Sequence, residues 1–299
     1  MQKKKPNFII IGAMKAATTS LYTYLKQHPD IFMTKVKEPM FFNNFNQEKD
    51  YKIIGSKSKK INTLEGYLSL FNDVKNEKAI GEASPAYIYN EKAPSLISNI
   101  LPKVKIIAIL RHPTDRAYSN FLHTKRADRE NITSFQLAIN EEENRIKEGW
   151  SPLYHYIEKG YYSVQLKRYY DLFPKENIKV FLFEDIVKHP KESLKDIFQF
   201  LNVDDSFEVD SSKKANVSGT PKGVLGFTLK KMRYYNLMPK FTISDYLPNF
   251  IVKLIFKSVY SESEKLDEEL RKEITVKYYK EEIKSLEKLI DRDLSSWLS

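Results

Sequence analysis

A segment near the start of the chain combines a lysine with hydroxyl residues and small residues. It reads Gly12-Ala13-Met14-Lys15-Ala16-Ala17-Thr18-Thr19-Ser20 and follows the apolar, β-branched run Phe8–Ile11. Backbone N–H groups at the start of a helix are free to bind an anion, small residues let it approach closely, and Lys15 adds a cation. The pattern predicts a phosphate-binding loop between a buried strand and a helix. A helix start capped by Thr or Ser side chains is the alternative.

This loop differs from the Walker A loop of nucleoside triphosphatases. That motif, G-x-x-x-x-G-K-[ST], requires a second glycine directly before the lysine, whereas here Lys15 follows Gly12 by three positions and the second glycine is missing. A magnesium-dependent nucleoside triphosphatase is therefore disfavoured.

A second pair, Arg111 and Ser119, follows the strongest apolar strand pattern of the chain, Val104–Leu110. Ligands of open α/β sheets gather at the carboxyl ends of the strands, where Arg111 is expected. Pro113 suits the first turn of a helix, and Ser119 then lies about two turns along it. Both side chains are therefore predicted to reach one phosphate. A structural arginine and a surface serine are the alternative.

These residues need a sheet that brings strand ends together, and the remaining periodicity predicts one. Short apolar runs alternate with helical patterns, which indicates an α/β fold with a central, mostly parallel sheet flanked by helices. No repeat or Pro/Gly-rich linker divides the chain, so a single domain over residues 1–299 is expected. The predicted strands are 8–11, 31–33, 79–80, 104–110 and 178–183; the predicted helices are 18–27, 91–101, 191–201 and 261–298; loops are predicted at 53–60 and 204–223.

The composition fits a globular protein with an anionic partner. The chain has 299 residues, 41% of them hydrophobic, and 49 basic against 39 acidic residues give a net charge of +10. That charge favours a nucleotide, a nucleic acid, a membrane surface or an acidic glycan, unless it only reflects lysine-rich surfaces. Cysteine is absent, which excludes thiolate metal sites and cysteine nucleophiles. The five histidines lack metal-ligand spacing, so no metal is expected.

The apolar run Phe8–Met14 is too short for a signal-peptide core with its cleavage site or for a membrane span. We therefore expect a cytoplasmic protein without a transmembrane segment. No nucleic-acid-binding motif is present, and no nucleic-acid partner is expected. The tyrosine-rich region Tyr154–Tyr170 suits core packing or sugar stacking, and core packing is preferred.

The segment FIIIGAMKAATTSLYTYLKQHPDI resembles the 5′-phosphosulfate-binding segment of sulfotransferases that use 3′-phosphoadenosine 5′-phosphosulfate (PAPS), especially the heparan sulfate and bacterial branches. The segment IIAILRHPTDRAYSNF resembles their 3′-phosphate motif, and SGTPKG resembles their late basic loop, with Pro221 in place of an expected arginine. The resemblance implies that Lys15 is catalytic, stabilising the leaving group. It also implies nucleotide binding by Lys15, Ala16, Ala17, Thr18, Thr19, Ser20, Arg111, Ser119, Lys222 and Gly223.

The segment KVKEPMFF resembles the family stretch that carries a glutamate, then a histidine two residues later, beside the sulfate. The resemblance implies that Glu38 is the general base, with Lys37 or Lys35 balancing its charge. Met40 occupies the histidine position.

The segment GEASPAYIY resembles another active-site stretch, in which heparan sulfotransferases carry a lysine after the glutamate. Ala83 occupies that position here, and the preceding Glu82 is a second candidate carboxylate. Phe183, at the end of the last predicted strand, occupies a position where relatives often place an aromatic residue against adenine. Core packing is the alternative for Phe183.

Taken together, the resemblance implies the P-loop-NTPase-like sulfotransferase fold and transfer of a sulfuryl group from PAPS to a hydroxyl or amine, with 3′,5′-ADP as product and no metal. The expected acceptor is a carbohydrate, as a glycan or glycolipid. Two alternatives stay open: an ATP-dependent kinase on a related fold, and a non-catalytic module that binds anionic glycans. Binding of 3′,5′-ADP but not ATP would distinguish the transferase from the kinase.

Overall fold

The computed structural model describes residues 4–45, 61–210, 219–221, 260–262 and 264–299. The chain divides into two compact units, one made of Met1–Ala215 with Leu266–Ser299 and one of Asn216–Lys265. The first unit contains the predicted sheet. In the second, β6 (Gly219–Pro221) pairs antiparallel with β7 (Tyr260–Glu262). The expectation of one domain over the whole chain stays a prediction.

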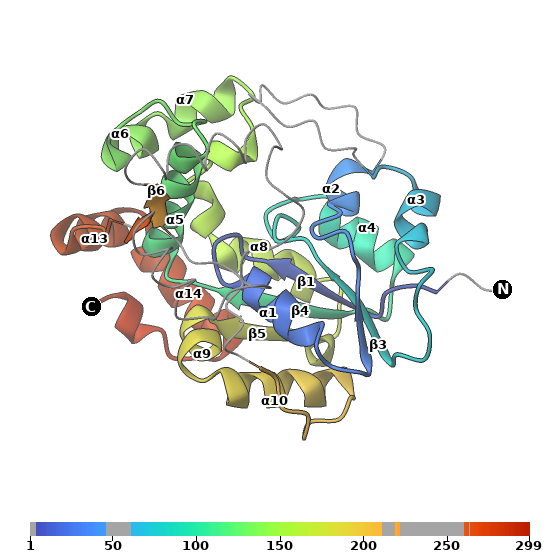
Figure 1. The fold of residues 1–299 in the computed structure, drawn as a ribbon. Helices are drawn as coiled ribbons and strands as arrows, with labels where there is room; N and C mark the ends of the chain where they lie inside the picture. Colours follow the sequence, from blue (N-terminus) through green and yellow to red (C-terminus); the bar gives the residue numbers. More distant parts are fainter. Residues whose placement is uncertain (1–3, 46–60, 211–218, 222–259, 263) are drawn as a thin grey trace. The chain divides into compact units, whose positions relative to one another are not determined.

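The first unit is built on a five-stranded parallel sheet in the order β2-β3-β1-β4-β5 (Figure 1). Because all strands run in one direction, their carboxyl ends meet at one edge, and the predicted site residues follow those ends. The strands are β1 (Phe8–Gly12), β2 (Ile31–Met33), β3 (Ala79–Ala83), β4 (Lys105–Leu110) and β5 (Ile178–Leu182).

The central strand β1 is buried along its whole length, and Ile9, Ile10 and Ile11 are fully shielded from solvent. A strand covered on both faces reads as a continuous apolar run, which explains the Phe-Ile-Ile-Ile sequence. Each buried isoleucine stabilises the fold by roughly 1.5–3 kcal/mol relative to an exposed one.

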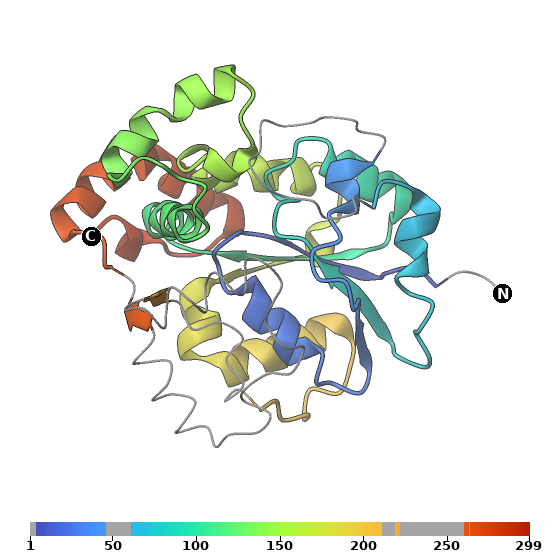
Figure 2. The same ribbon diagram turned by 45° about the horizontal axis from the view of Figure 1, so that its top comes forward.

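Helices cover both faces of the sheet: α1 and α10 lie on one face, and α5, α8 and α14 lie on the other (Figure 2). The α-helices are α1 (Thr18–Leu25), α2 (Phe41–Asn44), α3 (Leu64–Ser69), α4 (Ala93–Ile100), α5 (Pro113–Arg126), α6 (Phe135–Asn140), α7 (Glu142–Lys147), α8 (Tyr162–Tyr170), α9 (Phe183–Lys188), α10 (Pro190–Leu201), α13 (Glu268–Ile274) and α14 (Lys280–Ile290). Short helical turns are η1 (Pro152–Tyr154), η2 (Glu158–Gly160), η3 (Lys175–Asn177), η5 (Thr275–Tyr279) and η6 (Ser295–Trp297).

The α/β architecture is confirmed, with corrections at element ends. Helix α1 ends at Leu25 rather than at residue 27, and Phe183 begins α9 instead of ending the last strand. The predicted helix 261–298 is wrong at its start, because Ser261 and Glu262 belong to β7 and α13 begins at Glu268. Part of the predicted loop 204–223 is wrong, because β6 lies inside it. That strand contains Gly and Pro, which carry no strand signal, and it depends on a partner some forty residues later. The predicted loop 53–60 lies outside the described residues.

The C-terminal segment closes over the start of α5. Nε2 of His112 donates a hydrogen bond to the backbone carbonyl of Trp297 over 2.9 Å, and both residues are buried. The tyrosines of the 154–170 region that the sequence assigned to the core are buried there, and Tyr154, Tyr156, Tyr162 and Tyr169 are at most 1% exposed. The prediction that this region packs in the core is therefore confirmed.

Candidate functional site

The loop between β1 and α1 presents backbone donors that the described chain leaves free. The N–H of Ala13 donates to the carbonyl of Ile109 on β4, which fixes the start of the loop. Lys15 and Ala17 have positive φ angles of 70° and 64°, and no side chain caps α1. Within the described residues the backbone N–H groups of Thr18, Thr19 and Ser20 have no acceptor. The capped-helix alternative is therefore not what the structure shows.

Lys15 lies in a positively charged environment. Its ammonium forms no hydrogen bond or ion pair with the described part of the chain. The pKa of Lys15 is lowered from 10.5 to about 8, chiefly by burial and also by the charges of Arg126, Arg111 and Lys37, against the opposing effect of Glu38. Cations outnumber the carboxylates around Lys15, which is the arrangement of an anion site.

Arg111 reaches across to this loop from the end of β4. Its Nη1 donates to the backbone carbonyl of Lys15 over 3.3 Å, and its guanidinium lies 4.7 Å from the ring centroid of Phe183. The Arg111 carbonyl accepts a 3.0 Å hydrogen bond from the hydroxyl of Tyr162. Burial lowers the pKa of Arg111 as well. The residues that follow β1, β4 and β5 thus meet at one point.

Ser119 lies half-buried on α5, and its hydroxyl has no partner among the described residues. His123 and Arg126 follow at helical spacing on the same face of α5. The pKa of His123 is lowered to about 4, chiefly by burial and also by nearby positive charges, first among them Lys15 and Arg126. Neither His123 nor Arg126 was predicted for the site, although their spacing of four and seven residues from Ser119 was a usable signal.

Glu38 is linked to the loop through Lys37. Nζ of Lys37 donates to Oγ1 of Thr19 over 2.6 Å and lies 3.3 Å from Oε1 of Glu38. The Glu38 side chain is 43% exposed, so an acceptor can approach it. Lys35 instead pairs with Asp73 at 2.6 Å. Of the two lysines considered as charge partners, Lys37 is the one beside Glu38.

Glu82 lies beneath the segment that carries Glu38. It is fully buried and accepts hydrogen bonds from the hydroxyls of Ser84 at 2.7 Å, Tyr87 at 2.8 Å and Tyr67 at 3.2 Å. Burial raises the pKa of Glu82 from 4.5 to about 7, although the three hydrogen bonds oppose this shift. With no exposed surface, the Glu82 carboxylate cannot meet an acceptor in this conformation.

The hydroxyls around Glu82 also hold the 38–42 segment. Oγ of Ser84 accepts from the N–H of Met40 at 3.1 Å, and the hydroxyl of Tyr87 accepts from the N–H of Phe42 at 3.4 Å. Glu38 and Met40 both have a φ of 56°, an uncommon value for side-chain-bearing residues. These contacts fix the backbone on which Glu38 is presented.

Other predicted features are settled only partly by the structure. Lys222 and Gly223 lie outside the described residues. In the described ranges, no group of three or more His, Asp or Glu side chains is arranged to hold a metal ion. None of the helices in those ranges combines the length and apolar character that crossing a membrane requires.

A bis-phosphorylated nucleotide fits this arrangement. Among the described residues, no acceptor pairs with the first N–H groups of α1 or with the ammonium of Lys15, and these groups could bind one phosphate. Arg111 and the hydroxyl of Ser119, which has no partner in the same ranges, could bind a second.

Comparison with known proteins gives consistent matches. Residues 5–224 match the sulfotransferase domain family. The crystal structure of a sulfotransferase from Alicyclobacillus acidocaldarius is 31% identical in sequence, with a TM-score of 0.76, and the match covers 99% of this chain and 100% of that one.

Curated relatives match a shorter stretch. Bifunctional heparan sulfate N-deacetylase/N-sulfotransferase 4 of Mus musculus is 28% identical over 211 residues, which is 66% of this chain and 22% of the relative. Membrane-associated sulfotransferase kil1 of Dictyostelium discoideum is 35% identical over 119 residues, which is 39% of this chain and 22% of the relative. The chain thus matches about a fifth of the length of these relatives.

Proposed function

The chain belongs to the sulfotransferase domain family, and on that premise we propose that it transfers a sulfuryl group from PAPS to a hydroxyl or amine of an acceptor. One observation carries the proposal: Nη1 of Arg111 lies 3.3 Å from the backbone carbonyl of Lys15. Because of this contact, cations at the ends of two neighbouring strands can bind two phosphates of one nucleotide. In the reaction, the bond between sulfur and the bridging oxygen of PAPS breaks, a bond between sulfur and the acceptor atom forms, and 3′,5′-ADP leaves.

Lys15 and the N–H groups of Thr18, Thr19 and Ser20 bind the 5′-phosphate side, where negative charge grows on the leaving oxygen. Preorganised cations and amides stabilise such charge strongly because they need no reorganisation during the reaction. Arg111 and Ser119 hold the 3′-phosphate. Lys222 and Gly223 remain proposed ligands of that phosphate.

Glu38 takes the proton that the acceptor loses. Its carboxylate is accessible and joined through Lys37 to Thr19, and this position beside the nucleotide loop supports a role as base. Lys37 balances the charge of Glu38 and adds a further cation near the transferred group. The hydroxyls around Glu82 keep the 38–42 segment in place.

A carbohydrate, as glycan or glycolipid, is the proposed acceptor. The heparan sulfate sulfotransferases among the relatives and the net charge of +10 support this choice. We further propose that the protein acts as one domain in the cytoplasm without a metal. Screening carbohydrate acceptors with radiolabelled PAPS tests the activity directly, and no label transfer to any carbohydrate would contradict the acceptor class.

A further inference from the structure

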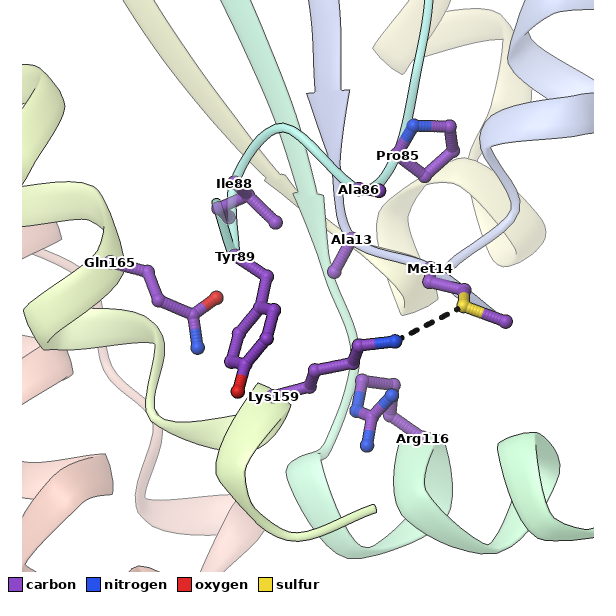
Figure 3. Close-up of a pocket in the computed structure, with 9 residues that line it drawn as sticks. All are labelled: Ala13, Met14, Pro85, Ala86, Ile88, Tyr89, Arg116, Lys159 and Gln165. Carbon is purple, nitrogen blue, oxygen red and sulfur yellow. Dashed lines mark hydrogen bonds between the residues drawn. The ribbon is translucent and has the colours of Figure 1, made fainter. Parts of the chain in front are cut away.

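A small pocket lies beside the nucleotide loop, between that loop, the segment after β3, and the elements α5, η2 and α8 (Figure 3). Met14 of the loop and Pro85 and Ala86 of the segment after β3 line it on one side. Arg116 of α5 and Lys159 of η2 enter from another, and the Lys159 side chain extends toward Met14. The pocket therefore joins a buried lysine to the loop that carries Lys15.

Lys159 is buried, and no carboxylate in the described part of the chain forms an ion pair with it. It is 7% exposed, and its Nζ contacts the Met14 Sδ at 3.7 Å and lies 5.7 Å from the ring centroid of Tyr89. A thioether is a weak acceptor, and an aromatic face replaces little of the hydration that an ammonium loses. The pKa of Lys159 is lowered to about 7, chiefly by burial and also by the charge of Arg116, against the opposing effect of Glu142. A buried, charged ammonium costs free energy, and an anion that binds next to it offsets this cost.

Arg116 adds positive charge to the same pocket. It is fully buried, and its Nη2 donates to the backbone carbonyl of Tyr156, whereas Nε and Nη1 have no acceptor among the described residues. The carboxylate of Glu142 already accepts the backbone N–H groups of Ile157 at 2.6 Å and Glu158 at 2.8 Å. The pocket therefore holds more hydrogen-bond donors and positive charge than its own acceptors use.

The pocket lies next to the proposed transfer site. Met14, which contacts Lys159, directly precedes Lys15 in the chain. Burial is the main cause of the lowered pKa of His123, and the charges of Lys15 and Lys159 also lower it. Both lysines are therefore close enough to His123 on α5 to affect its charge. Position 83, where the heparan sulfotransferases carry a lysine, is alanine here, and Pro85 two residues later lines the pocket. Lys159, from a different element, lines the same pocket as Pro85.

We propose that Lys159 binds the sulfuryl group of the donor, its Nζ exchanging the Met14 Sδ contact for a sulfuryl oxygen. This inference rests on the proposed function and assigns one more residue to the same site. A ligand without the sulfuryl group gains nothing from Lys159. The residue therefore distinguishes PAPS from 3′,5′-ADP, which the phosphate-binding residues do not.

Calorimetric titration of PAPS and of 3′,5′-ADP, without acceptor, tests the proposal in the wild type and in Lys159→Met. The affinity for 3′,5′-ADP should stay within about twofold, while the affinity for PAPS should fall roughly 10- to 100-fold, as expected for one lost charge-assisted hydrogen bond. Lys159→Gln carries the same prediction and replaces Lys159→Met if that variant does not fold. Lys167→Met, at an α8 lysine paired with Asp171 on the surface, is the matched control and should bind both ligands like the wild type.

The role of Lys159 alone would be overturned if the variant bound both PAPS and 3′,5′-ADP like the wild type. It would also be overturned if both affinities fell equally, which would indicate a structural effect on the loop. A wild-type protein that binds neither ligand would instead overturn the proposed function, and with it this inference.

Discussion

The guanidinium of Arg111 donates a 3.3 Å hydrogen bond to the backbone carbonyl of Lys15, across 96 positions of sequence. The contact follows from the sheet, because β1 and β4 are parallel neighbours and their carboxyl ends meet at one edge. Parallel neighbours in such a sheet commonly place ligand-binding loops together. In the proposed function, this contact brings the two phosphate-binding groups close enough to hold one nucleotide.

Replacing Arg111 should remove recognition of the 3′-phosphate specifically. Arg111→Ala is expected to weaken binding of 3′,5′-ADP roughly 10- to 100-fold, because a charge-assisted hydrogen bond to a phosphate is lost. Binding of 5′-AMP, which has no 3′-phosphate, should change much less. Ser119→Ala should show the same selectivity with a smaller loss, since its hydroxyl is neutral. Competition titrations measure both, and an equal loss for the two nucleotides would contradict the assignment.

Nucleotide affinity should depend on pH through Lys15. The pKa of Lys15 is lowered to about 8, chiefly by burial and also by Arg126, Arg111 and Lys37 against Glu38, so Lys15 is mostly protonated below pH 8. The phosphate binds the ammonium form, so affinity for 3′,5′-ADP should be level from pH 7 to 8. Above pH 8 the affinity should fall by up to about tenfold per pH unit. The fall ends at the pKa of Lys15 in the complex, which the bound phosphate raises. Lys15→Met should bind weakly without this fall, and a wild-type profile that stays level to pH 9.5 would exclude Lys15 as the responsible group.

Glu38→Gln should separate binding from chemistry. The variant keeps the size of the side chain but has no basic carboxylate, so 3′,5′-ADP affinity should stay within about twofold while turnover falls roughly 10²- to 10⁴-fold. Turnover is measured with an acceptor found by the radiolabel screen. Glu176→Gln, at an exposed position on η3, serves as the matched control. Wild-type turnover in Glu38→Gln would remove this residue from the mechanism.

Glu82 should make stability depend on pH. Its folded-state pKa of about 7 is above the ordinary 4.5, chiefly because of burial, so the folded protein holds this proton more tightly than the unfolded chain. The resulting stabilisation is complete below pH 4.5 and is lost as the pH rises through 7, up to about 3 kcal/mol. Urea unfolding of the wild type and of Glu82→Gln at pH 5 and pH 8 isolates this contribution, because other groups act equally in both. A free-energy difference that is the same at both pH values would refute it.

The sequence predicted the sheet and the nucleotide loop because both depend on local patterns. The apolar run before Gly12 and the run before Arg111 each form a strand that parallel pairing buries, and the residues after them had to lie together. The helix start at Thr18 and the position of Ser119 followed from the same local patterns.

Residues brought to the site by long-range packing were not predicted. Lys159 is an ordinary lysine in sequence, and only the packing of η2 against the loop shows it to be buried beside Met14. Arg126 lies beside Lys15 because α5 crosses the strand ends. The Lys37 contact with Thr19, which decides between Lys37 and Lys35, depends on a turn with positive φ at Glu38 that no residue pattern indicated.

Calorimetric titration of the wild-type protein with 3′,5′-ADP and, separately, with ATP and magnesium tests the central claim most directly. We predict saturable one-to-one binding of 3′,5′-ADP and at least tenfold weaker binding of ATP, because the site is built for phosphates at both the 3′ and the 5′ positions. Tighter binding of ATP with magnesium than of 3′,5′-ADP would contradict the two-phosphate site and favour a kinase.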